Sequence, residues 1–138
     1  MTKENRRANI AIEVARGDAS LESAEILLAA GKYADAISRA YYAAFHYARA
    51  LLLTLGEEPI SHAGVERLLH RDVVRPGLLD ADVARQFAHL QKMRHDADYT
   101  SEFVFTLRGA TDDVAAATEF IAAARRILES GAWVEPRP

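Results

Sequence analysis

One arginine, Arg94, stands on the apolar face of a predicted helix. Residues recur there at spacings of four, three, four and three, in the series Val83, Phe87, Leu90, Arg94 and Ala97. Such spacings line residues along one face of a helix. A guanidinium keeps its charge in a protein, so one that faces inward needs a carboxylate, a phosphate or water at a subunit boundary. Arg94 is therefore either part of a structural ion pair or part of an anion-binding site.

The residues that follow Arg94 are compatible with both interpretations. Asp98 comes four residues later, which is the spacing of an ion pair within a helix, and Tyr99 would then pack over that pair. In the other interpretation Arg94 binds a phosphate, with His95 or Tyr99 beside it. The residue types alone favour neither.

A second group of polar and aromatic residues lies on an earlier predicted helix. Arg39, Tyr42, His46 and Arg49 follow spacings of three, four and three, which predicts a ridge along one side. Guanidinium, phenol and imidazole groups in a line can hold a phosphate or stack on a base. The alternative is that Tyr42 and His46 are half-buried core residues and the arginines are solvated.

His62 directly follows Ser61, which is suited to cap a helix. The first turn of a helix favours an anion, although an exposed histidine in a turn is the plainer interpretation. No two histidines are four residues apart, and the chain has no cysteine. We therefore expect no metal site.

Established catalytic motifs are missing from the sequence. Asp96 and Asp98 are two residues apart and so point to different sides of a helix. There is no GxSxG, no P-loop and no glycine-rich dinucleotide turn, so we expect no cofactor.

The composition is that of a helical protein. The chain has 138 residues, half of them hydrophobic, with only 7 glycines and 4 prolines. A net charge of −3 argues against coating nucleic acid by bulk electrostatics. The lack of cysteine suits a reducing compartment, and no run approaches the roughly 18 apolar residues of a membrane span. We expect a cytoplasmic protein without a membrane partner.

The periodicity predicts an all-α, up-and-down bundle of about five helices. Caps and breakers place these helices at about 6–30, 33–55, 61–74, 81–97 and from Thr111 or Asp112 to 130. Gly17-Asp18 is expected to weaken or kink the first helix. We expect one domain over residues 1–131 and a loose tail over 132–138. Because the second helix is apolar on more than one side, it is either central or shared with a subunit interface, and we favour a homodimer.

Several segments of the chain resemble the small prokaryotic HEPN domains (higher eukaryotes and prokaryotes nucleotide-binding). The resemblance covers about residues 19–128 and rests on four segments: SRAYYAAFH at 38–46, SHAGV at 61–65, VRPG at 74–77 and RHDADY at 94–99. It implies a helical bundle that commonly dimerises. Many members are ribonucleases or toxins encoded beside a small nucleotidyltransferase antitoxin.

The resemblance also implies a role for Arg94. In the active members an arginine, a neighbouring polar residue and a histidine a few residues later meet across the dimer and cut RNA without metal. Arg94 matches the arginine and His95 the polar position, but Tyr99 stands where the histidine would fall. A phenol of ordinary pKa near 10 is a poor proton shuttle at neutral pH.

Three functional hypotheses follow. The first is an RNA- or nucleotide-binding HEPN protein, for example the toxin-side partner of a nucleotidyltransferase antitoxin, with a binding set of Arg39, Tyr42, His46, Arg94, Asp98 and Tyr99. The second is a metal-independent endoribonuclease with Arg94 and His95 as its catalytic residues. The third is a non-catalytic interaction scaffold in which Arg94 only pairs with Asp98.

Overall fold

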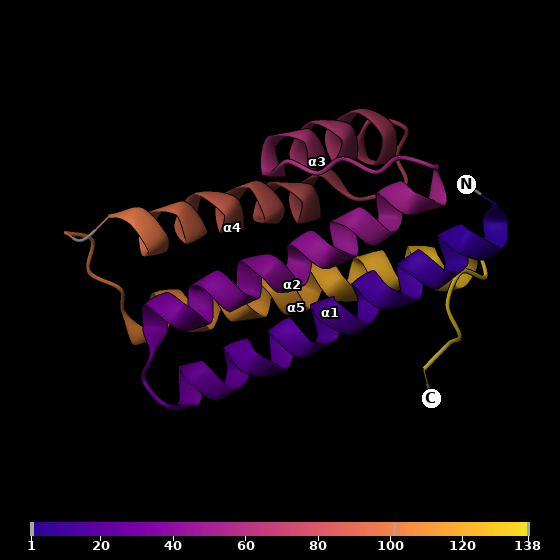
Figure 1. Ribbon diagram of the computed structural model, residues 1–138. Helices are drawn as coiled ribbons and strands as arrows, with labels where there is room; N and C mark the ends of the chain where they lie inside the picture. Colours follow the sequence, from indigo (N-terminus) through magenta and orange to yellow (C-terminus); the bar gives the residue numbers. More distant parts are fainter. Residues whose placement is uncertain (1, 101, 138) are drawn as a thin grey trace.

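The computed structural model describes residues 2–100 and 102–137, and within them it contains only helices and their connections. The elements are α1 (Lys3–Ala29), α2 (Tyr33–Thr54), α3 (His62–Leu69), the π-helical turn η1 (His70–Val74), α4 (Ala81–Tyr99) and α5 (Leu107–Ser130). Figure 1 shows long helices lying side by side, with short α3 above the ends of α2 and α4. The predicted all-α bundle of about five helices is confirmed.

Helix α2 is the centre of this bundle. It packs against α1, α3, α4 and α5 (Figure 1). Most of its residues are buried, and Tyr41, Tyr47 and Leu52 are completely so. The wide apolar surface of α2 is thus covered within one chain. It no longer argues for a subunit interface, and the homodimer stays a prediction.

Helix α1 differs from the prediction both at its start and at Gly17, where a kink was expected. It begins at Lys3, because the Thr2 side chain accepts a hydrogen bond from the Asn5 amide at 3.1 Å and caps the helix. It also continues through Gly17 without a break. A Cβ at Gly17 would lie 2.6 Å from Cδ2 of Tyr47, so glycine here permits close packing of α1 on α2.

Helix α5 begins earlier than the sequence suggested. The predicted start at Thr111 or Asp112 is wrong, because Thr106 caps the helix: its hydroxyl accepts a hydrogen bond from the Gly109 amide at 3.0 Å. Gly109 thus lies inside the first turn of the helix. Only a short connection separates α5 from the end of α4 at Tyr99.

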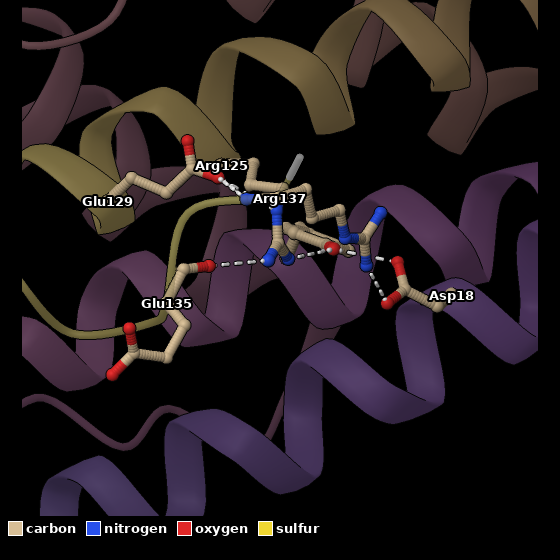
Figure 2. A network of polar contacts seen from close by, with 6 residues as sticks. Asp18, Arg125, Glu129, Glu135 and Arg137 are labelled. Atoms are coloured by element: carbon tan, nitrogen blue, oxygen red, sulfur yellow. Dashed lines mark hydrogen bonds and ion pairs between the residues drawn. The ribbon is translucent and has the colours of Figure 1, made fainter.

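Residues 132–137, predicted to be loose, lie along α1 and α5 (Figure 2). Trp133 packs at the edge of the core, and Arg137 forms an ion pair with Asp18 of α1. Arg125 of α5 donates to the Glu135 carbonyl at 3.0 Å. The remaining residue of the predicted tail, Pro138, lies outside the described residues.

The helices of the structure can be compared with the length and hydropathy that a membrane span needs. Within residues 2–100 and 102–137, none of them combines the length and the apolar character needed to cross a membrane.

Candidate anion-binding site

Arg94 lies on the inner face of α4, as its position in the apolar stripe predicts. Only 9% of the residue is exposed. Aromatic rings surround its guanidinium: the Cζ atom is 5.3 Å from the ring centroid of Tyr41, 5.8 Å from that of Tyr42 and 5.9 Å from that of Tyr99. Cations are attracted to the faces of such rings, which hold the group in place.

The charge of Arg94 is only partly balanced. Its Nη1 donates to Oδ2 of Asp98 at 3.3 Å, so the ion pair expected from the spacing exists. The Nε atom, however, is buried without a hydrogen-bond partner among the described residues. Burial alone would lower the pKa of Arg94, but Tyr42 and the bond to Asp98 outweigh it and the pKa is raised. The result is a permanent cation with an unused, buried donor.

A tyrosine–histidine pair stands next to this guanidinium. The hydroxyl of Tyr41 and Nδ1 of His62 are 2.7 Å apart. Burial, and to a smaller degree the charge of Arg94, lowers the pKa of His62. Burial also raises the pKa of Tyr41 well above its usual value. Both groups are therefore neutral near pH 7.

The predicted ridge on α2 divides into two halves. In the first half, the guanidinium of Arg39 lies 4.7 Å from the ring centroid of Tyr42, which also faces Arg94. In the second half, His46 is bonded through Nδ1 to Oε2 of buried Glu13 at 2.7 Å. Arg49 is 3.7 Å from the same carboxylate.

Glu13 is the partner of both residues in the second half of the ridge, His46 and Arg49. Although burial opposes it, the hydrogen bond from His46 and the nearby arginines lower the pKa of Glu13. The structure thus places His46 in a polar contact between α1 and α2. Of the residues predicted to bind RNA or a nucleotide, Tyr42, Asp98 and Tyr99 lie beside Arg94, and Arg39 lies over the Tyr42 ring.

Known proteins support a family assignment for this helical arrangement. Residues 13–132 match the HEPN domain family. The chain belongs to the HEPN domain family. Putative toxin MJ0605 of Methanocaldococcus jannaschii is 40% identical over 91 residues, which are 66% of this chain and 66% of that protein. UPF0332 protein PH1297 of Pyrococcus horikoshii is 45% identical over 69 residues, 50% of this chain and 49% of that protein.

These matched stretches span only about half to two thirds of the curated relatives' own length. Among solved structures, TT1696 from Thermus thermophilus has a similar fold, with a TM-score of 0.75 and 21% identity. The alignment covers 86% of this chain and 98% of that one. The predicted resemblance to HEPN domains is confirmed, and the fold is shared with TT1696.

Two further residues of the HEPN motif segment lie at the surface. His95 and Tyr99 are exposed, Tyr99 to 69%, and their ring centroids are 5.0 Å apart. Helix α4 runs unbroken to Tyr99, so His95 projects about 100° around the helix from Arg94. The Tyr99 ring thus lies beside both the Arg94 guanidinium and the His95 ring.

Two residues beside Arg94 are only weakly indicated by the sequence. The apolar pattern of α2 indicates only a core position for Tyr41, and the turn before α3 indicates an exposed histidine at His62. Their pairing joins segments 21 residues apart, and periodicity within one helix gives no information about it. The one available signal was the SHAGV segment of the HEPN resemblance, which contains His62.

Other features of the described chain lie away from Arg94. Among the residues that the structure describes, no three histidine, aspartate or glutamate side chains lie close enough together to hold a metal ion. A cavity of about 210 Å³ lies between α3 and α4 and is lined by largely apolar residues with His70 and Arg85 at its edge. Arg94 does not line this cavity.

Proposed function

We propose that this HEPN protein is toxin-like and binds single-stranded RNA or a nucleotide through the phosphate group, with Arg94 as the principal ligand. The observation that carries the proposal is the state of the guanidinium: nine-tenths buried, ringed by tyrosines, and with its Nε donor unpaired. An unpaired buried donor on a charged group costs free energy, which a bound anion would recover.

The ion pair with Asp98 is a weaker explanation for a buried arginine. It consists of a single contact at 3.3 Å, whereas strong arginine–carboxylate pairs are bidentate and shorter. Asp98 is itself largely at the surface, where water screens the pair. A phosphate has enough oxygens to accept from both Nη and Nε, and the planar fork of guanidinium donors matches their arrangement.

Flanking residues support the choice of a nucleic-acid ligand. Arg39 adds a second cation beyond the Tyr42 ring, and Tyr99 offers an exposed aromatic face. Stacking on aromatic rings and contacts to phosphates are the two main sources of affinity for single strands. The proposed binding set is therefore Arg94, Arg39, Tyr42 and Tyr99, with Asp98 as a competitor for the guanidinium.

The names of the relatives support a toxin–antitoxin context. The relative from Methanocaldococcus jannaschii is named a putative toxin. We propose that this protein acts as the toxin-side partner of a nucleotidyltransferase antitoxin, and that it works as a homodimer. The exposed phenol of Tyr99, which touches Arg94, is within reach of such a partner.

A second candidate is a metal-independent endoribonuclease that uses Arg94 and His95. The observation in its favour is the exposed imidazole of His95, 5.0 Å from the ring of Tyr99 that covers Arg94. Movement of Tyr99, at the last residue of α4, would open Arg94 and His95 to the same RNA. Cleavage of RNA in the presence of a chelator, abolished by Arg94→Ala, would favour this candidate.

Binding of a labelled single-stranded RNA oligonucleotide, followed by fluorescence anisotropy, tests the main proposal. We expect Arg94→Ala to lower the affinity about 10- to 100-fold, because hydrogen bonds to charged groups contribute about 1.5–3 kcal/mol. The matched control is Arg85→Ala on the same helix, whose exposed side chain pairs with Asp82. Thermal unfolding of each variant shows whether it folds.

The same pair of variants separates binding from a purely structural role. If Arg94→Ala binds RNA as tightly as the wild type but unfolds at a lower temperature, Arg94 is only a structural ion pair and the proposal fails. Arg94→Lys is a second variant that keeps the charge. Because lysine lacks the fork of donors, we expect an intermediate affinity.

A further inference from the structure

We propose that His62 is a second anion-binding group of the Arg94 site and donates its Nε2–H, as a neutral imidazole, to the bound phosphate. This inference rests on the proposed function and adds a named residue to it. The ligand class is a phosphate monoester or diester, to which His62 adds a neutral donor beside the Arg94 guanidinium.

The first argument is position. His62 and Arg94 flank the same two rings: the His62 centroid is 5.6 Å from that of Tyr41 and 5.9 Å from that of Tyr42. The Arg94 Cζ is 5.3 and 5.8 Å from those centroids. The charge of Arg94 also contributes to the lowered pKa of His62. His62 of α3 and Arg94 of α4 thus lie beside the same pair of tyrosine rings on α2.

The second argument is the tautomer of His62. The hydroxyl of Tyr41 is completely buried, and Nδ1 of His62 is its hydrogen-bond partner in the described chain. If Nδ1 carried the proton, the phenolic hydrogen would be left without an acceptor, which is costly in the interior. Tyr41 must therefore donate to Nδ1. The ring proton of neutral His62 then resides on Nε2.

The third argument is electrostatic. Burial, the neighbouring Arg94 and the N-terminus of α3 all oppose a positive charge on His62, its first helical residue. The imidazole therefore stays neutral but remains a donor, and the half-buried side chain retains access to solvent. A neutral donor beside Arg94 stabilises a phosphate without adding a further positive charge next to the buried guanidinium.

Substitutions of His62 test the proposal with inorganic phosphate and with the labelled RNA oligonucleotide as probes. We expect His62→Ala to lower the affinity for both about fivefold to tenfold. We expect His62→Gln to stay within about threefold of the wild type, because its amide can donate from a similar position. The control is His70→Ala, which removes an exposed histidine of η1.

A double variant protects the test against misfolding. His62→Ala leaves the Tyr41 hydroxyl buried and unpaired, so the single variant is expected to unfold at a lower temperature. Tyr41→Phe combined with His62→Ala removes both partners and should recover stability while affinity stays low. If that double variant binds as tightly as the wild type, His62 is only a structural partner of Tyr41 and the inference is overturned.

The tautomer provides an independent readout. Two-dimensional ¹H–¹⁵N spectra that couple ring nitrogens to carbon-bound protons distinguish protonated from unprotonated nitrogens. We expect the proton on Nε2, and a shift of that resonance when phosphate is added. A proton on Nδ1, or an Nε2 resonance that phosphate leaves unchanged, would contradict the proposal.

The outcomes also separate this inference from the proposed function. If Arg94→Ala lowers affinity and the His62 variants do not, the Arg94 site stands and only the role of His62 fails. If neither substitution changes affinity, both proposals fail. If His62→Ala weakens binding but Arg94→Ala does not, the proposed function fails and His62 belongs to a different anion site.

Discussion

Nδ1 of His46 and Oε2 of Glu13 are 2.7 Å apart across the interface of α1 and α2. Glu13 is only 5% exposed, and Arg16 and Arg49 lie 3.8 and 3.7 Å from its other oxygen. The imidazole thus contacts a buried carboxylate of α1. His46, which the sequence predicts to bind RNA or a nucleotide, is therefore a polar contact between two helices.

We expect His46→Ala to destabilise the protein without weakening RNA binding. Loss of the imidazole leaves Oε2 of Glu13 without its short hydrogen bond, at a cost of about 1–3 kcal/mol. Urea unfolding measures the change in stability, and His70→Ala serves as the exposed control. A variant that unfolds like the wild type yet binds RNA more weakly would return His46 to the binding site.

The sequence predicted the fold better than the site. Apolar periodicity, together with caps and helix breakers, located all the long helices, and it placed Arg94 correctly on the inner side of α4. The start of α5 was misjudged because a capping threonine three residues before a glycine resembles a loop. The role of His46 could not be predicted, because its partner lies 33 residues away on another helix.

Trp133 is expected to stabilise the bundle although it follows the last helix. Its ring packs against the core edge, with Nζ of Lys3 at 5.5 Å and Cζ of Arg7 at 5.9 Å from its centroid. We expect Trp133→Ala to lower the free energy of unfolding by about 1–3 kcal/mol. Arg137→Ala, which removes a half-exposed ion pair with Asp18, should cost less than about 1 kcal/mol.

These two substitutions also test the expected loose tail. Their effects are measured by thermal unfolding at one protein concentration, since a dimer would make the midpoint depend on concentration. If Trp133→Ala unfolds at the wild-type temperature, the Trp133 ring contributes nothing to stability. If Arg137→Ala also does so, the contacts of Arg137 in Figure 2 are incidental.

The stability of the protein should fall as the pH drops below about 6.5. His62 has a lowered pKa in the folded chain and its ordinary value of 6.5 in the unfolded chain. Between these two values the unfolded chain binds a proton that the folded chain does not, so stability is lost as the pH falls through this window. Urea unfolding from about pH 7.5 to about pH 5.5 measures the slope.

Substitution of His62 identifies the source of that slope. His62→Gln cannot titrate, so its stability should vary less over the same pH range. Glu13, whose pKa is also lowered, adds its own loss only below 4.5, and it does not interfere. An unchanged slope in His62→Gln would assign the pH dependence to another group.

Asp98→Asn should increase the affinity for RNA. Asp98 is the carboxylate that contacts Nη1 of Arg94, so it competes with a phosphate for the same guanidinium. A partly exposed pair of this kind is worth about 0.2–1 kcal/mol, and its removal should strengthen binding by up to about fivefold. Asp96→Asn makes the same charge change two residues earlier on α4 and is the matched control. Equal gains in both variants would indicate general electrostatics, whereas weaker binding by Asp98→Asn alone would mean that the carboxylate orients Arg94 for its ligand.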